Sequence, residues 1–164
     1  MPISVVGTSA VGSVNSSSMP AGTPLQVVSA TTATAVTISA GTGTYHDLGL
    51  EVTITPIDPN NNFAVWFYCP NLRKTTGGGT GAYFVGRCQV NGVDSSPGMY
   101  TGAVGYPETF SDHRYLWNGH AVLTSGFSAG SNTMKLQGTA PGSSSWVFAH
   151  QGQTQHLTVM EIAV

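Results

Sequence analysis

The chain has 164 residues and a mass of 17.0 kDa, which is the size of one ordinary domain. Only 7% of its residues are charged and the formal net charge is −2, whereas about a quarter of the residues in an average soluble domain are charged. Five Lys and Arg residues are too few to neutralise a run of phosphates. We therefore expect no nucleic-acid binding. Every apolar run is interrupted before it is long enough to cross a bilayer, so we expect no membrane insertion. No Lys or Arg precedes Arg73, so we also expect no signal peptide.

The low charge bears on association as well. A weakly charged surface does little to keep copies of a chain apart. Uncharged polar surface can also be buried between chains without taking ions out of water. We therefore expect the protein to act as a homo-oligomer.

The first part of the chain differs from the rest. Residues 1–46 contain no charged side chain, and residues 1–24 consist of short apolar pairs separated by Gly and Ser. A disordered terminus is one interpretation of such sequence, and an arm that becomes ordered against a partner is the other. We predict a docking arm over residues 1–24 that becomes ordered against a partner protein. Its predicted contact residues are Ile3, Val5 and Val6.

From residue 25 the sequence has the pattern of β-structure. In residues 50–55 Leu50, Val52 and Ile54 alternate with polar residues, as in a strand with one buried face. No stretch shows sustained helical periodicity, and Gly-rich turns separate the short candidate strands. This pattern predicts an all-β fold over residues 25–164, an antiparallel β-sandwich of jelly-roll type with an extended N-terminal arm. The candidate strands are 25–29, 33–39, 50–55, 63–69, 83–91, 115–127, 132–138, 146–150 and 156–164.

Two of these strands are apolar on both faces, namely 63–69 and 156–164. In the last strand, Leu157 and Val159 point to one side, while the opposite side is apolar too. A strand buried within the sandwich would explain the pattern, and so would a strand with one face in the core and one at a subunit interface. The predicted oligomer interface consists of Met160, Ile162 and Val164.

The residues that could carry chemistry are few. The densest cluster of titratable groups is Asp112, His113 and His120, and we expect ordinary hydrogen bonds there. Residues 58–69 begin like a calcium loop but lack its Gly at position six and its Glu at position twelve. We therefore expect no catalytic residues, no metal and no cofactor, and hence no enzyme.

The two cysteines, Cys69 and Cys88, both fall on the apolar side of a candidate strand. Two buried free thiols are the interpretation that we prefer, because free cysteine behaves as a small apolar side chain. A disulfide stays open, since spacing alone does not settle connectivity.

Aromatic residues in the Gly- and Pro-rich segment 92–107 suggest a second kind of site. Tyr100 and Tyr106 lie in this segment, which we expect to be a long surface loop. Tyr combines an apolar ring with a polar tip, which suits contacts with sugars and other ligands. The two tyrosines are therefore candidates for contact with a host receptor or surface glycan, although rings that pack back onto the sandwich would fit as well.

Two segments carry a resemblance to a known family. Residues 45–56 (YHDLGLEVTITP) and 156–163 (HLTVMEIA) resemble the first and last strands of small β-sandwich domains in tailed-phage virion proteins, namely fibre tips and capsid decoration proteins. The similarity covers about residues 44–163. Family members usually have an Arg-Asp-Gly turn where this chain has residues 89–94 (QVNGVD).

The resemblance implies a trimeric virion domain without enzymatic activity, and we expect it at the virion surface. A short fibre or knob and a capsid decoration protein both agree with it. A host-receptor or carbohydrate-binding module is the alternative function, because it shares the fold class and the aromatic loops.

Overall fold

The computed structural model describes residues 19–75, 83–95, 100–101 and 114–164, and of 100–101 it describes the backbone alone. This part of the chain is built from strands and one short 3-10 turn, η2 (His150–Gly152), and it contains no α-helix. Correspondingly, the described residues include no helix that is long and apolar enough to span a membrane. The strands are β1 (Pro24–Thr32), β2 (Val36–Ile38), β3 (Thr42–Ile54), β4 (Asn62–Lys74), β5 (Val85–Val90), β6 (Val93–Asp94), β7 (Tyr100–Thr101), β8 (Arg114–Leu123), β9 (Asn132–Ala140), β10 (Trp146–Phe148) and β11 (Gln155–Ile162).

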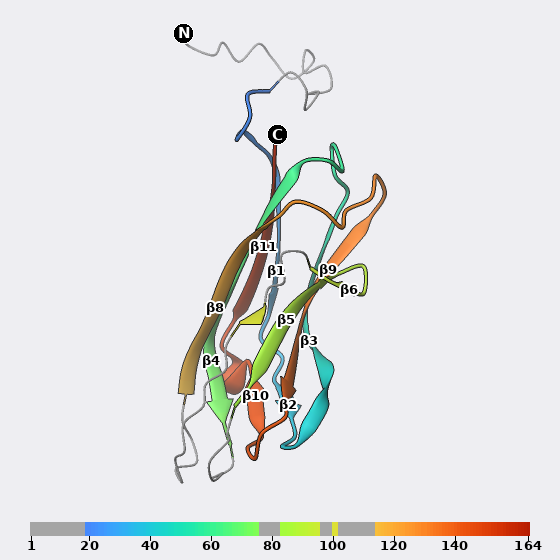
Figure 1. Cartoon of the computed structure of the whole chain (residues 1–164). Coiled ribbons are helices and arrows are strands. Elements are labelled where there is room, and N and C mark those ends of the chain that lie inside the picture. The colour runs from blue at the N-terminus through green and yellow to red at the C-terminus, as the bar shows by residue number, and fades with distance from the viewer. Residues whose placement is uncertain (1–18, 76–82, 96–99, 102–113) are drawn as a thin grey trace.

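The strands form two antiparallel sheets that pack face to face (Figure 1). In sheet 1 the order is β1–β11–β4–β8, and the short strands β10 and β2 extend it from one end of β4. In sheet 2 the order is β3–β9–β5, with β6 and β7 both paired to β5. Successive long strands alternate between the sheets, which is the connectivity of a jelly roll. The predicted fold class is thus confirmed.

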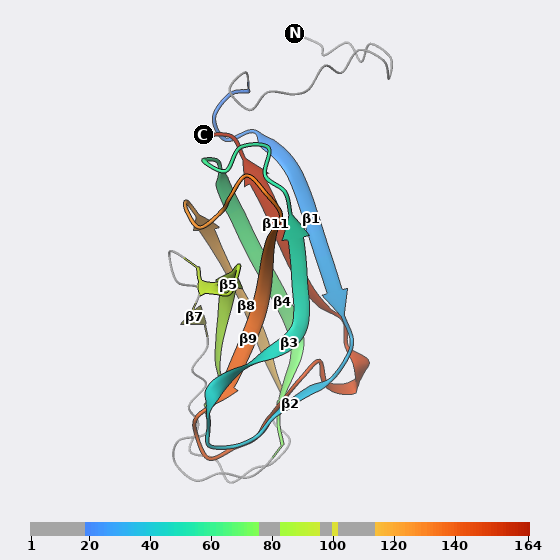
Figure 2. The same ribbon diagram turned by 90° about the vertical axis from the view of Figure 1, so that its right-hand side faces the viewer.

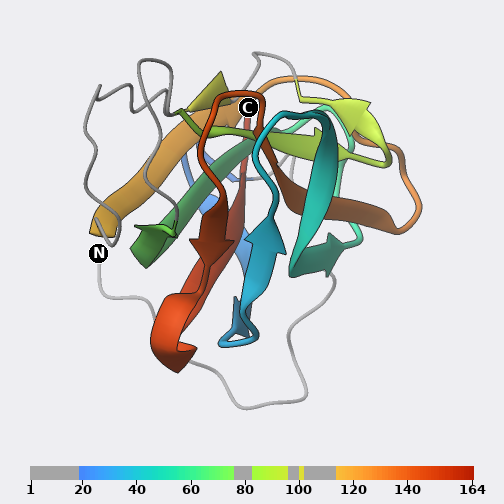
Figure 3. The same ribbon diagram turned by 90° about the horizontal axis from the view of Figure 1, so that it is seen from below.

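The two ends of the sandwich differ in the segments that lie there. The start of β1 and the C-terminus lie at the same end (Figure 2), where the amide of Gly22 donates to the carbonyl oxygen of Ala163 at 2.8 Å. The short strands β2 and β10 pair at the other end (Figure 3). The predicted arm contacts Ile3, Val5 and Val6 lie outside the described residues, so the docking arm remains a prediction.

The core lies between the sheets and is rich in aromatic rings. Trp117 of β8 is at its centre, with ring centroids 4.4 Å from Phe67, 5.1 Å from Phe84 and 6.0 Å from Phe148. The alternation predicted for residues 50–55 is confirmed, because Leu50, Val52 and Ile54 are all buried. Further core side chains are Ile38, Leu48, Phe63, Val65, Leu72, Met134, Leu136, Trp146, Leu157 and Val159.

The two cysteines are buried in this core and are free. Burial raises the pKa of the Cys69 thiol to about 11 and that of Cys88 to about 12. Because the thiolate is the reactive form, both thiols are protonated and inert at neutral pH. The interpretation as small apolar side chains is confirmed.

Segment 92–107 is not purely a loop, which corrects the expectation from sequence. Asn91 and Gly92 join β5 to β6 as a two-residue turn with φ of 53° and 81°. Two successive residues with positive φ are typical of a type I′ hairpin turn, for which Asn-Gly is the preferred pair. β7 lies further along the same segment and pairs with Gly86 and Arg87. Two-residue strands carry no periodicity, so the sequence pattern could not reveal them.

One tight contact in the core gives a stability prediction. Gly86 of β5 faces the ring of Trp117, and a Cβ atom added there would lie 2.1 Å from Trp117 Cζ2. The ring cannot withdraw, because three other aromatic rings enclose it. We expect Gly86→Ala to reduce the free energy of unfolding by about 2 kcal/mol through overpacking. Urea unfolding measures the loss, and Gly43→Ala is the control because nothing lies within 4 Å of its Cβ position. Equal stability of the two variants would contradict this packing.

Candidate assembly surface

The side of sheet 1 that faces away from the core presents apolar side chains to solvent. We call this side the outer face. It is formed by the outward side chains of β1, β11, β4 and β8, and Trp66 and Tyr68 lie near its middle, 38% and 47% exposed. Strand register aligns the outward residues in three rows: Val27, Met160, Ala64 and Val122; Ser29, Thr158, Trp66 and His120; Thr31, His156, Tyr68 and Asn118.

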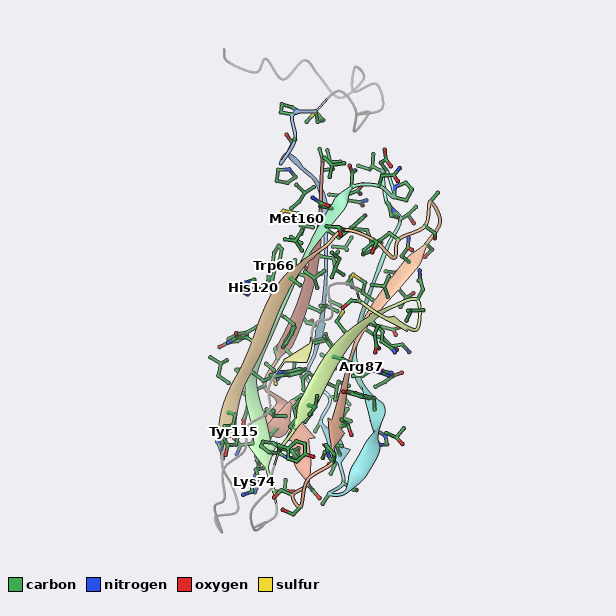
Figure 4. All side chains as sticks on the ribbon, viewed as in Figure 1. Trp66, Lys74, Arg87, Tyr115, His120 and Met160 are labelled. Carbon is green, nitrogen blue, oxygen red and sulfur yellow. The ribbon has the colours of Figure 1, made fainter. Side chains whose placement is uncertain are left out.

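The first row is apolar in all four strands and lies toward the C-terminal end of β11. Val27 and Val122 in this row are 53% and 48% exposed, and Val164 beyond the end of β11 is 62% exposed. We call this end of the outer face the apolar pole; it consists of Val27, Ala64, Val122, Met160, Ile162 and Val164. Toward the middle, Met160, Trp66 and His120 lie on the same side of sheet 1, as Figure 4 shows.

The second and third rows combine polar side chains with the two aromatic rings of Trp66 and Tyr68, and they contain no Asp, Glu, Lys or Arg. Ser29 Oγ and Thr158 Oγ1 are 3.0 Å apart, and the rings of Tyr68 and His156 are 6.5 Å apart. Charged residues enter the described face only at the end opposite the apolar pole, where Arg73 and Arg114 are register partners. We call this end the arginine end. The outer face is therefore apolar at one end and mixed polar and aromatic in its middle, and toward the other end it carries Arg73, Arg114 and the exposed Leu116.

The opposite side of the molecule is different in kind. On the outer side of sheet 2, Asp47 accepts from Lys135 at 3.0 Å, and Arg87 pairs with Asp94 at 2.9 Å. The guanidinium of Arg87 also lies 3.9 Å from the ring centroid of Tyr45. Hydrogen bonds from Gln137 and Lys135 lower the pKa of Asp47, and burial offsets only part of this effect. Of the charged residues that the structure describes, the outer side of sheet 2 thus carries Asp47, Glu51, Arg87, Asp94 and Lys135, whereas the outer face of sheet 1 carries only Arg73 and Arg114.

The predicted interface residues Met160, Ile162 and Val164 all lie at the apolar pole. Met160 and Ile162 are partly buried by their own chain and Val164 is exposed. The residues that complete the pole, notably Val27 and Val122, were missed by sequence reasoning. They lie on β1 and β8, whose positions beside β11 and β4 come from long-range pairing. Alternation within β1 and β8 could have identified Val27 and Val122 as outward apolar residues. Alternation does not show which strands are neighbours, however, so it could not place the two valines on one surface with Met160.

A buried carboxylate supports the sheet at this pole. Glu161 of β11 is fully buried and accepts hydrogen bonds from four donors: Gln26 Nε2, the amides of Ile57 (2.9 Å) and Asp58 (2.9 Å), and Asn61 Nδ2 (2.7 Å). Burial alone would raise the pKa of Glu161, but these hydrogen bonds outweigh it and lower the pKa. The carboxylate joins β1, β11 and the turn before β4. We assign it a structural role, because its lone pairs are occupied by the chain's own donors.

Elsewhere, the described residues offer little chemistry. A cavity of about 300 Å³ lies beside the β5–β6 hairpin, but Asp94 in its wall already bonds Arg87 and Gln89. Within the described ranges, no three His, Cys, Asp or Glu side chains are grouped so that they could hold a metal ion. Of the two tyrosines expected to contact a receptor, Tyr100 has its backbone in β7 and Tyr106 lies outside the described residues.

No protein-family model and no curated protein matches the chain. The solved structures with a similar fold include that of infectious bursal disease virus Gx strain, at 14% identity and a TM-score of 0.39 over 88% of this chain and 38% of that one. They also include the structure of the Gt strain, at 14% identity and a TM-score of 0.44 over 88% of this chain and 39% of that one. The VP2 subviral particle of the same virus is 15% identical, with a TM-score of 0.40 over 99% of this chain and 42% of that one. The chain therefore spans about two fifths of the length of these structures.

Proposed function

We propose that this chain is a non-enzymatic structural protein of a virus particle and that it acts there as a homo-oligomer built on its jelly-roll sandwich. The observation that carries the proposal is the outer face of sheet 1, which exposes Val27, Trp66, Tyr68 and Val122 on a regular sheet. Exposed apolar patches of this kind mark interaction sites in soluble proteins. Among the described residues, the outer face carries charged side chains only at Arg73 and Arg114 near one end, so most of this face can be covered without burying ions.

The role in a virus particle rests on two further considerations. Jelly rolls recur in viral structural proteins, which is an argument by analogy of fold. The resemblance of residues 45–56 and 156–163 to tailed-phage virion domains supplies the finer proposal, a trimeric fibre knob or capsid decoration protein at the virion surface. The predicted arm, residues 1–24, would then dock on other virion proteins, and the sandwich would point outward.

Purified virus particles from the source provide the test. We expect quantitative mass spectrometry of density-purified particles to detect the chain at a fixed copy number relative to the major particle protein. We also expect washing in moderate salt to leave it attached, because the predicted arm contacts are apolar and salt screens only charge. Particles that lack the chain, with the protein recovered only in the supernatant, would contradict a structural role.

A receptor- or carbohydrate-binding module is the second candidate. It is favoured by Trp66 and Tyr68, which are exposed at neighbouring outward positions of β4 and could stack on sugar rings. Tyr100, whose backbone lies in β7, and Tyr106 remain the predicted contacts for such a ligand. Saturable binding to a glycan array that is lost in Trp66→Ala or Tyr100→Ala would favour this function, and absence of binding would remove it.

A further inference from the structure

We infer that two copies of this chain pair edge to edge through β8, in antiparallel orientation and centred on Gly119, so that Leu116 of each copy lies opposite Val122 of the other. This inference rests on the proposed homo-oligomer and adds one contact that builds it. It follows from the place of β8 at the edge of sheet 1, from the regularity of this strand and from the order of the outward side chains along it.

β8 forms one edge of sheet 1 in the part of the chain that the structure describes (Figure 1). One side of β8 pairs with β4, and no described strand pairs with its other side. β8 is 10 residues long, and its only charged residue, Arg114, stands at its first position. The register shift in its pairing with β4 lies between Cys69 and Leu72, so the extra residue is in β4 and β8 itself is regular. A long, regular edge without charge can pair with a strand of another chain.

The other edges of the sandwich have the features by which edge strands usually avoid a partner, namely charge, proline, bulges or short length. β3, at the edge of sheet 2, contains Asp47 and Glu51 and has extra residues at its register shifts against β9. β1, at the second edge of sheet 1, begins at Pro24 and has an extra residue before Gln26. β2, β6 and β7 are two or three residues long. Among the described edges, β8 is therefore the best suited to a partner strand.

The outward side chains of β8 complement their own order read in reverse. Leu116 and Val122 are 59% and 48% exposed, and Asn118 and His120 between them are exposed too. Antiparallel pairing centred on Gly119 sets Leu116 opposite Val122 and Asn118 opposite His120, and the two-fold axis repeats each pair. The Cβ atoms of side chains directly opposite each other are about 4.5–5.5 Å apart. The apolar pair can therefore cover itself, and the polar pair can form a hydrogen bond.

The register follows from the same order of side chains. Moving the centre by one residue, to Asn118, would set Leu116 opposite His120 and Val122 opposite Arg114, so that apolar side chains would face polar ones. Gly119 also suits the centre, because a glycine inside a strand often marks a place where another backbone approaches closely. It is not among the residues with positive φ, so the conformation of β8 does not itself require glycine there.

The pairing gives the exposed Leu116 a partner. Leu116 lies toward the arginine end of its own chain, whereas Val122 belongs to the apolar pole. Antiparallel pairing brings the arginine end of one copy beside the apolar pole of the other, so each leucine packs against the pole of its neighbour. Sheet 1 of one copy then continues into sheet 1 of the other, and their outer faces form one surface.

Disulfide formation between two variants of the full-length protein tests the inference. Leu116→Cys and Val122→Cys each replace an exposed side chain, while the native Cys69 and Cys88 are buried in the core and free. The two variants carry tags of different mass, are mixed under conditions that allow subunit exchange and are then mildly oxidised. We expect at least ten times more disulfide between the two variants than between two chains of either one.

The geometry of the inferred pair explains this preference. Opposite residues of paired strands have Cα atoms about 4.5–5.5 Å apart, which is within the range of a disulfide. Leu116 of one copy and Leu116 of the other would be separated by the strand length from residue 116 to residue 122, about 20 Å, which is too far. A mixture of Leu116→Cys with Val93→Cys, at an exposed valine of β6, measures the background of random collision.

Other outcomes would overturn the inference in distinguishable ways. Disulfides within each variant but not between the two would show parallel strands. Disulfide between the variants at the background level, in a protein that light scattering shows to be oligomeric, would place the contact elsewhere. A stable mass of three chains would also overturn the inference, because a two-fold contact joins chains in pairs. These three results leave the proposed homo-oligomer intact, whereas a monomer in light scattering removes both.

Discussion

Glu161→Gln is expected to reduce the free energy of unfolding by about 3 kcal/mol, because hydrogen bonds to a charged group contribute about 1.5–3 kcal/mol each. The carboxylate of Glu161 accepts from four donors on three separate segments. An amide of the same size retains one acceptor oxygen and turns an NH₂ group toward donors. At least one buried N–H then has no acceptor, and the turn before β4 loses its link to β11.

The same carboxylate predicts how stability depends on pH. Its folded-state pKa lies below its value in the unfolded chain. Its contribution is therefore fully present above the unfolded pKa, near 4.5, and is lost as the pH falls through the lower, folded-state pKa. We expect the wild-type protein to lose stability on acidification in this range and Glu161→Gln to lose less.

Urea unfolding at fixed chain concentration between pH 3 and pH 7 measures both effects. Glu51→Gln is the matched control, since Glu51 is exposed on sheet 2. This control should change stability by less than about 0.5 kcal/mol, as surface substitutions usually do. Parallel pH profiles for the wild type and Glu161→Gln would contradict the role assigned to the buried carboxylate.

Val122→Asp is expected to weaken self-association about a hundredfold or more while the chain stays folded. Val122 is 48% exposed in the single chain, so an aspartate there keeps access to water in the monomer. In the assembly the carboxylate would be buried at the apolar pole without a cation, and a penalty of about 3 kcal/mol corresponds to about a hundredfold in the association constant.

Val93→Asp provides the control for this substitution. It makes the same chemical change at a valine that is 70% exposed on β6, in sheet 2. Analytical ultracentrifugation should show the dissociation constant of Val93→Asp within about threefold of the wild type. If Val93→Asp dissociates the oligomer and Val122→Asp does not, the interface lies on sheet 2. Near-ultraviolet circular dichroism of each variant checks that the aromatic core around Trp117 is intact.

The sequence was sufficient to predict the fold class and individual strands, because their signals are local. The alternation of Leu50, Val52 and Ile54 marks a strand with one buried face wherever it pairs. The Asn91-Gly92 turn is equally local, since both residues adopt the positive φ that a tight hairpin requires. The apolar outward side of the last strand was also visible, because Met160 and Ile162 alternate with buried residues.

The assembled surface could not be predicted in the same way. Val27 and Val122 join Met160 in one row only because β1 pairs with β11 and β8 pairs with β4, and these pairings link distant parts of the chain. The role of Glu161 depends on donors that are 100 or more residues away in sequence. In both cases the chemistry of each residue is plain from the sequence, but its neighbours are set by sheet register.

The solution mass of the purified full-length chain, measured by light scattering over a range of concentrations, tests the central claim that the outer face of sheet 1 holds copies of this chain together. We expect a stable mass at a whole-number multiple of 17.0 kDa for the wild type, three chains if the resemblance holds, and a shift to the single-chain mass for Val122→Asp. A wild-type mass of one chain at every concentration would contradict the account, because the apolar pole would then stay exposed to water.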